Sequence, residues 1–192
     1  MNTVIEPVAK PTTSLVAVYQ RIVKLMGNRF EISVAAADEQ WANDVIDAAI
    51  AEISRIEKLL TTFSDTSQTN LVNKYAGIKP VEVDREMFDL VARSQKISEL
   101  TQGAFDISYG SIDKSLWNFD KNMTALPEPA VAKQLVRLIN YRNIILDGDN
   151  CTIFLKEKGM RIGFGGIGKG YAAEMAKVVM NLNFAVAQNL PK

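Results

Sequence analysis

Apolar and polar residues alternate along the chain with two periods, which together predict strands and helices. Strands are expected at residues 16–26 and 29–36, because apolar side chains alternate with polar ones along the second stretch. Gly27-Asn28 between them suits the tight turn of a hairpin. From about residue 38 to residue 60 the period becomes that of an amphipathic helix. Its expected buried face consists of Ile46, Ala49, Ile50, Ile53, Ile56 and Leu60, and its expected solvated face carries Glu52, Arg55 and Glu57.

The middle of the chain predicts a second helix that follows a short strand. The strand is expected at residues 81–83, and Asp84 is a suitable N-cap for the helix after it. Gly103 is expected to end this helix, because glycine accepts the positive φ found just past many helix C-termini. The side chains expected to face the core are Phe88, Val91 and Leu100.

Further along, the pattern predicts a short helix at residues 129–138 and a hairpin of strands 143–147 and 151–155. Helices and antiparallel hairpins therefore follow one another in a mixed order. This order favours an α+β domain, with a mixed or antiparallel sheet and helices packed on it.

A glycine-dense stretch at residues 159–170 stands between an extended run and a helix expected from Tyr171 to about Leu182. Glycine lets a ligand approach the backbone closely. The free N–H groups at the start of a helix attract anions, usually phosphate, and Lys169 would add a full positive charge. The alternative is a tight turn that needs its glycines for packing alone.

Two known phosphate-binding motifs match this stretch only in part. Gly163, Gly165 and Gly168 fit the G-x-G-x-x-G dinucleotide motif, but no acidic residue follows Glu174 to bind a ribose. The stretch also contains G-x-x-x-x-G-K, yet Gly170 stands where a P-loop needs a hydroxyl for magnesium. Neither motif is therefore expected to act here.

Composition excludes several other kinds of site. The 22 basic and 22 acidic residues balance, so no field is expected that would attract nucleic acid. The chain has no histidine and one cysteine, Cys151, so a zinc site is not expected, and any metal should be a hard ion held by oxygens. Cys151 is predicted to be a small core residue. The N-terminal residues 1–13 resemble no signal segment, which predicts a flexible arm on a protein that is cytoplasmic or else has lost its leader.

Residues 103–119 are loop-like and rich in aromatic side chains. Long ordered loops within compact domains are often functional, although the same rings could fill a core or an interface. These aromatic residues are Phe105, Tyr109, Trp117 and Phe119.

Five motifs in order give the chain a resemblance to a known family. They are Met-Gly at 26–27, Ile-Glu-Lys-Leu-Leu at 56–60, Gly-Ala-Phe-Asp at 103–106, Leu-Trp-Asn-Phe at 116–119 and Gly-Gly-Ile-Gly-Lys-Gly-Tyr-Ala at 165–172. From about residue 25 to residue 180 the chain resembles the FAD:protein FMN transferases, flavin transferases formerly described as thiamine-biosynthesis lipoproteins. Members of this family are often periplasmic or membrane-anchored.

The resemblance implies a Mg²⁺-dependent reaction that cleaves the pyrophosphate of FAD. The FMN part is transferred to a Ser or Thr hydroxyl of a target flavoprotein, and AMP leaves. By position, the resemblance implies that Gly166 offers its carbonyl to Mg²⁺. The resemblance identifies no particular catalytic side chain, so the catalytic residues stay unknown. The residues implied to bind FAD are Met26, Phe63, Ala104, Phe105, Asp106 and Lys169.

Two departures from the family pattern change what is expected. Gly163 stands where the family usually has an acid. Residues 14–182 resemble only the N-terminal part of the transferase domain, and residues 183–192 form an atypical tail. The sequence therefore predicts an incomplete fold with an exposed strand edge, self-association, and a chain that transfers FMN weakly or not at all alone.

Two other interpretations remain open from the sequence. The chain could be a non-catalytic binder of FAD or another nucleotide, made from the retained part of the fold. It could also be a fragment product that has no role of its own.

Overall fold

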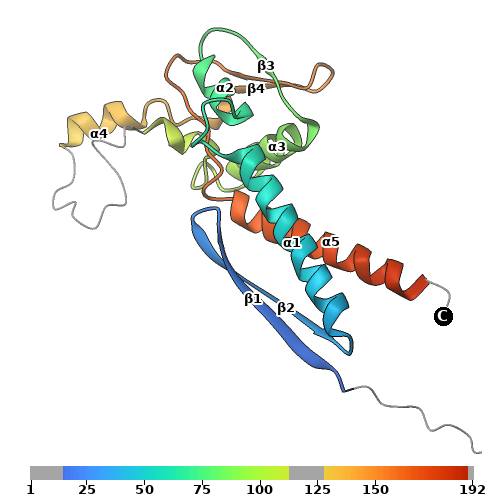
Figure 1. The fold of residues 1–192 in the computed structure, drawn as a ribbon. Coiled ribbons are helices and arrows are strands. Elements are labelled where there is room, and N and C mark those ends of the chain that lie inside the picture. Colours follow the sequence, from blue (N-terminus) through green and yellow to red (C-terminus); the bar gives the residue numbers. More distant parts are fainter. Residues whose placement is uncertain (1–14, 113–127, 190–192) are drawn as a thin grey trace, which may run out of the picture.

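The computed structural model describes residues 15–112 and 128–189. Figure 1 shows a long hairpin beside two long helices, with a small sheet and shorter helices beyond the hairpin turn. The strands are β1 (Ala17–Leu25), β2 (Asn28–Ala36), β3 (Val81–Glu82), β4 (Ile144–Asp147) and β5 (Thr152–Leu155). The helices are α1 (Glu39–Leu60), α2 (Gln68–Lys74), α3 (Arg85–Leu100), α4 (Pro129–Val136), α5 (Gly168–Asn189) and the 3-10 helices η1 (Ile107–Ser111) and η2 (Tyr141–Asn143).

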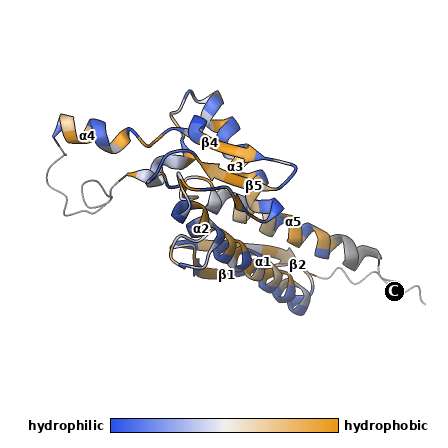
Figure 2. Cartoon of the chain, turned by 90° about the horizontal axis from the view of Figure 1, so that it is seen from above, coloured by the Kyte–Doolittle hydropathy of each residue, from blue (hydrophilic) through white to orange (hydrophobic). Residues whose placement is uncertain are grey.

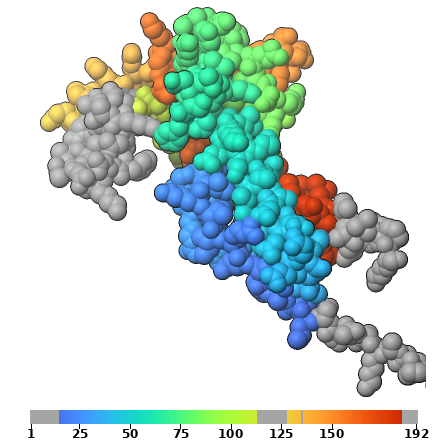
Figure 3. Space-filling view, in the orientation of Figure 1, coloured from blue at the N-terminus to red at the C-terminus, as the bar shows by residue number. Residues whose placement is uncertain are grey.

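The N-terminal hairpin forms as its alternating pattern predicts. β1 and β2 pair antiparallel from Leu25 opposite Asn28 to Ala17 opposite Ala36. The turn places Met26 at φ 50° and Gly27 at φ 69°. Two successive residues with positive φ match the twist of a hairpin, but Met26 is a residue that rarely adopts this conformation. The apolar face of β2 lies against α1, and the space-filling view shows the hairpin along this helix (Figure 3).

Two long helices provide much of the core. The predicted inward face of α1 is confirmed, since its apolar residues are buried except for the partly buried Ile50. Asp38 caps the helix by accepting a hydrogen bond from the Trp41 N–H. α5 packs against α1 (Figures 1 and 2), and its residues Ala172 and Ala176 are buried. This helix begins at Gly168 and continues to Asn189, so it is longer than the sequence pattern predicted.

The second sheet has the order β3-β5-β4, and all of its pairs are antiparallel. The predicted hairpin of its last two strands is confirmed, and together with the packed helices it confirms the α+β class. Cys151 was expected in a strand, but it lies half-buried in the preceding turn with φ 52°. The prediction that Leu100 faces the core is wrong, because it ends α3 and is 72% exposed.

Two further differences from the sequence-based expectations concern local structure. Asp84 occupies the N-cap of α3, but its carboxylate accepts from the Gln68 side chain instead of capping the helix. The helix α2 was not predicted, because a helix this short shows little periodicity. Trp117 and Phe119 lie outside the described residues. No helix within the described ranges is long and apolar enough to cross a membrane.

Candidate functional site

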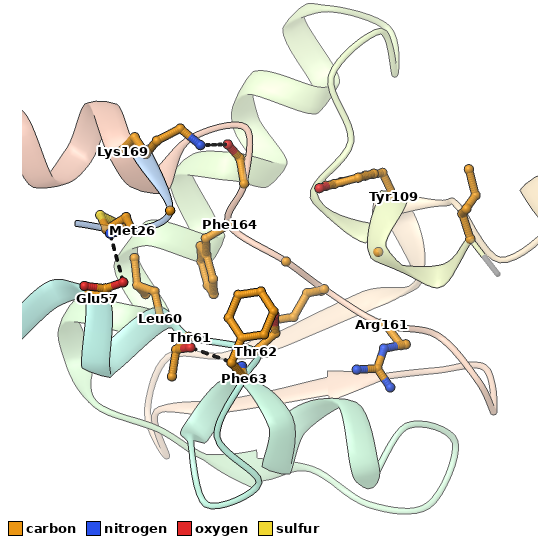
Figure 4. Close-up of a pocket in the computed structure, with 16 residues that line it drawn as sticks. Met26, Glu57, Leu60, Thr61, Thr62, Phe63, Tyr109, Arg161, Phe164 and Lys169 are labelled. Carbon is orange, nitrogen blue, oxygen red and sulfur yellow. Dashed lines mark hydrogen bonds between the residues drawn. The ribbon is translucent and has the colours of Figure 1, made fainter. Parts of the chain in front are cut away.

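A cavity of about 530 Å³ opens where the hairpin turn, the end of α1, η1 and the glycine stretch meet (Figure 4). Its volume falls within the range of about 300–1,000 Å³ that is typical of small-molecule sites. One wall is the glycine stretch with η1, and the opposite wall is the loop after α1. The lining residues are Met26, Gly27, Glu57, Leu60, Thr61, Thr62, Phe63, Tyr109, Gly110, Ile112, Arg161, Ile162, Gly163, Phe164, Gly165 and Lys169.

The glycine wall is held in place from two sides. On one side the buried Asn73 side chain pairs with Ile162: Nδ2 donates to the Ile162 carbonyl (3.1 Å), and the Ile162 N–H donates to Oδ1 (2.7 Å). On the other side Gly163 N–H donates to the Ile107 carbonyl (3.1 Å). The Arg161 N–H donates to Ser111 Oγ (2.8 Å). The backbone before the loop is thus fixed without belonging to a sheet.

Past this fixed segment the chain turns into α5. The Gly168 N–H donates to the Phe164 carbonyl (2.6 Å), and Lys169 Nζ donates to the Gly165 carbonyl (3.2 Å). The N–H groups of Gly165 and Gly166 donate no hydrogen bond to any described residue. Free N–H groups at a helix start, beside a lysine and an open cavity, form an arrangement suited to an anion such as phosphate.

The opposite wall is much less tightly packed. Thr61 Oγ1 accepts from the Phe63 N–H (3.1 Å), and Asn70 Nδ2 donates to the carbonyls of Thr62 (2.9 Å) and Ser64 (2.8 Å). These bonds shape the loop backbone but leave the Phe63 ring 97% exposed. An exposed aromatic ring at the mouth of a cavity offers an apolar surface to a ring-shaped ligand.

The hairpin turn closes the cavity through a backbone contact. The N–H of Met26 donates to Glu57 Oε1 at 2.8 Å, as Figure 4 shows. This bond ties the turn to α1 and keeps the positive φ of Met26 in place. Glu57 was expected on a solvated helix face, but it is half-buried and lines the cavity.

The cavity contains only some of the residues implied to bind FAD. Met26, Phe63 and Lys169 line it together. Ala104, Phe105 and Asp106 do not line it, and neither does Gly166, the residue implied to bind Mg²⁺. The contacts of all seven residues with FAD or Mg²⁺ stay predictions.

Two of the residues behind the cavity have clear structural contacts. The Asp106 carboxylate caps η1, accepting from the Ser108 N–H (2.8 Å), the Ser108 hydroxyl (2.7 Å) and the Tyr141 N–H (2.9 Å). The structure therefore shows Asp106 capping this short helix. The Phe105 ring lies directly against Gly166, where an added Cβ would be 3.1 Å from Cε2.

A charged network behind the site ties α5 to two other helices. Arg55 on α1 pairs with Glu52 (2.8 Å) and with Glu86 on α3 (2.7 Å), and the Tyr171 hydroxyl donates to Glu86 (2.7 Å). Hydrogen bonds from Arg55 lower the pKa of both glutamates. Burial, followed by the bond to Glu86, raises the pKa of Tyr171 to about 12. The network fixes the first turn of α5 just after the glycine loop.

The described residues do not fit a complete Mg²⁺ site. Nowhere among them do three His, Cys, Asp or Glu side chains gather closely enough to hold a metal ion. Glu57 is the one described carboxylate that lines the cavity, and it already accepts the Met26 N–H. Mg²⁺ binds through carboxylates, phosphates and water, so these residues alone would hold it weakly.

Sequence reasoning missed four residues with a part in this site. Tyr109 was noted only as one aromatic among several, and Arg161 and Asn73 were not singled out. Glu57 was placed on the solvated face of its helix. The signal for Glu57 was its position within the 56–60 motif, whereas the pairing of Asn73 with Ile162 spans 89 residues and has no local signal.

Comparison with known proteins assigns the fold and the family. The chain is 31% identical over 160 residues to an FAD:protein FMN transferase of Klebsiella pneumoniae (strain 342), covering 83% of the chain and 49% of that relative. An FAD:protein FMN transferase of Treponema pallidum (strain Nichols) is 30% identical over 138 residues, covering 67% and 38%. The chain thus spans about half the length, or less, of these curated relatives.

Solved structures show the same fold. The ApbE protein of Thermotoga maritima superposes with a TM-score of 0.76 at 24% identity, covering 87% of this chain and 53% of the other. Flavin transferase ApbE from Vibrio cholerae gives a TM-score of 0.75 at 15% identity, covering 88% and 55%. A model of the ApbE family matches residues 26–184. The chain therefore belongs to the ApbE family.

Proposed function

We propose that the chain binds FAD in the cavity and takes part in transferring its FMN moiety to a target flavoprotein. The observation that carries the proposal is the glycine loop, where Gly165, with a free N–H, lines an open cavity together with Lys169 and the free N–H of Gly166 follows directly in the chain. The diphosphate of FAD is the anion that this wall would hold. The names of the curated relatives support the same reaction.

In the proposed reaction a Ser or Thr hydroxyl of the target flavoprotein attacks the FMN phosphorus. The new bond joins the hydroxyl oxygen to that phosphorus, and the bond to the bridging oxygen of the diphosphate breaks. AMP leaves with that oxygen, and the hydroxyl proton passes to solvent. Lys169 and the loop N–H groups would neutralise charge on the phosphates, which is the main protein contribution in phosphoryl transfer.

Mg²⁺ belongs to the proposal as the ion that would neutralise phosphate charge, with the Gly166 carbonyl as one ligand. The described residues do not form a complete site for the ion. We expect for the same reason that the chain alone transfers FMN weakly or not at all.

The proposal is tested by two measurements on the purified chain. Titration of FAD fluorescence should give saturable binding. Incubation with FAD, Mg²⁺ and a target flavoprotein should give little covalent flavin, detected as a fluorescent protein band. Absence of FAD binding would contradict the proposed site, and robust labelling would contradict the expectation of weak transfer.

The second candidate function is non-catalytic binding of FAD or a related nucleotide. The scarcity of carboxylates around the described cavity favours it. This function predicts micromolar or weaker affinity for FAD that Mg²⁺ hardly changes. Titrations with and without Mg²⁺ separate the two, because a transferase site should bind FAD more tightly with the ion.

We further propose that the chain self-associates through β1. This strand pairs only with β2 among the described strands, so its other edge is open. Val18 is 71% and Ile22 is 52% exposed on its outer face. Open apolar edges invite pairing with another chain, and an edge lysine prevents it. Light scattering should therefore give a larger mass for the native chain than for Ile22→Lys, and equal monomeric masses would contradict this proposal.

A further inference from the structure

The phenol of Tyr109 projects into the cavity from η1 and ends at the glycine loop (Figure 4). A Cβ added to Gly165 would lie 2.9 Å from the Tyr109 hydroxyl oxygen. The side chain of Lys169 reaches the same residue from α5, because Nζ donates to the Gly165 carbonyl. A hydroxyl and an ammonium group from two distant parts of the chain thus converge on one glycine.

The Tyr109 hydroxyl has no hydrogen-bond partner among the described residues, and its side chain is 40% exposed. A buried phenol usually finds a partner, whereas one that faces a cavity is available to a ligand. Its position is nevertheless well defined, because its backbone belongs to a tightly held segment. The Tyr109 N–H donates to the Asp106 carbonyl, the Asp106 carboxylate caps η1, and Ile107 accepts from Gly163.

We infer that Tyr109 is a ligand-binding residue that donates a hydrogen bond to the diphosphate group held at the glycine loop. The inference rests on the proposed function, since it places the FAD diphosphate beside Gly165. An anion that accepts from the free N–H groups there would lie between Lys169 and the phenol. Asp106 then acts as a positioning residue, because it holds η1 and so the hydroxyl in place.

A packing role for Tyr109 makes a different prediction. If the ring only fills the space above Gly165, phenylalanine would serve equally well. If the hydroxyl binds phosphate, its removal weakens the binding of every ligand that contains the diphosphate. Tyr109→Phe therefore separates the two roles while preserving the ring.

The experiment measures the binding of FAD and of ADP to the native chain, to Tyr109→Phe and to the control Tyr75→Phe. Tyr75 does not line the cavity. Removal of a hydrogen bond to a charged group lowers affinity by roughly tenfold or more. Tyr109→Phe should therefore weaken the binding of FAD and of ADP by a similar factor. The melting temperature and the affinities of the control should stay unchanged.

The outcomes separate this inference from the proposed function. A native chain that does not bind FAD would contradict the proposed function itself. A native chain that binds FAD but not ADP would overturn the inference, because the diphosphate would not be the anchor. Equal affinities of the native chain and Tyr109→Phe would overturn it while leaving the proposed function intact.

A second variant tests the contact at Gly165. In Gly165→Ala the new methyl group would collide with the Tyr109 hydroxyl, whereas the next ring atom lies at 4.0 Å. We expect Gly165→Ala to weaken ADP binding strongly in the native background and only slightly when combined with Tyr109→Phe. An equal loss in both backgrounds would show that the hydroxyl does not take part.

Discussion

The two walls of the cavity differ in how firmly the fold holds them. The glycine wall is bonded on both sides, by Asn73 to Ile162 and by η1 to Gly163, and its apolar residues are buried. On the opposite wall the loop backbone is tied to Asn70, but the ring of Phe63 contacts mainly solvent. One wall is already shaped, and the other has a side chain free to adapt.

This difference matches what each end of the proposed ligand needs. A diphosphate is bound best by donors that are already in position, because no free energy is then spent on ordering them. A flat ring gains mostly from apolar contact, which an exposed side chain can make by moving onto it. We therefore expect mutations in the glycine wall to alter stability or phosphate binding, and mutations in the Phe63 loop to alter ring binding.

The largest effect is expected for Asn73→Ala. It leaves the buried N–H and carbonyl of Ile162 without partners, and each such group costs about 1–3 kcal/mol. Unfolding free energy should fall by about 2–6 kcal/mol, which lowers the melting temperature by roughly 4–24 °C in a chain of this size. Denaturant unfolding and thermal scans measure both quantities.

The matched control for this change is Asn183→Ala, in which an exposed asparagine of α5 loses a bond within its own helix. Its stability should change by less than about 0.5 kcal/mol. If both variants unfolded alike, the glycine wall would not be held by Asn73.

Lys169→Ala comes next and should act on binding alone. Its Nζ bonds only the Gly165 carbonyl among the described residues, and a cation near a helix start is unfavourable without an anion. FAD and ADP affinity should fall by about 10- to 100-fold, with an unchanged melting temperature. Lys177→Ala on the same helix is the control. A loss of stability with unchanged binding would reverse the assignment.

Phe63→Ala should weaken the binding of FAD but not that of ADP, unlike Lys169→Ala, which should weaken both. Removal of the exposed ring should weaken FAD binding by about tenfold, because one aromatic contact and its buried area are lost. ADP has no flavin ring, so its affinity should stay unchanged. The melting temperature should not change, because the ring packs on little of the chain. Phe184→Ala removes an exposed ring that contacts Trp41 instead. If Phe63→Ala weakened ADP binding as much as FAD binding, the proposal that one wall binds the diphosphate and the other binds the flavin ring would be contradicted.

The smallest effect concerns acid stability. Arg55 lowers the pKa of Glu52 and Glu86, so their contribution is present above the ordinary glutamate pKa of 4.5 and is lost as pH falls through the lower folded values. The native chain should therefore exceed Arg55→Met in stability at neutral pH, by about 1 kcal/mol or less for such exposed pairs. The difference should shrink below about pH 4.5, and a constant difference down to pH 2 would argue against the network.

Much of the fold was predictable because its elements are long and strongly periodic. The N-terminal hairpin and α1 follow directly from alternation and from a continuous apolar face. The helix α2 has too few residues for such a pattern, although Ser67 is a good N-cap and does accept from Asn70. That short helix carries both Asn70 and Asn73, which hold the two walls of the cavity.

Of the residues implied to bind FAD, three line the cavity, namely Met26, Phe63 and Lys169. Their contacts with FAD stay predictions. The motif residue Asp106 instead holds η1, and through it Tyr109. Local sequence cannot distinguish a residue that lines a cavity from one that positions the lining, because the difference depends on contacts between distant segments.

The most direct test of the central claim is a crystal structure of the chain with FAD bound. The account predicts the diphosphate about 3 Å from the N–H groups of Gly165 and Gly166, the usual distance for such bonds. It also predicts Lys169 and the Tyr109 hydroxyl on the same phosphates, with Phe63 moved onto the flavin ring. A diphosphate bound away from the glycine loop, or a cavity filled by the chain's own side chains, would contradict it.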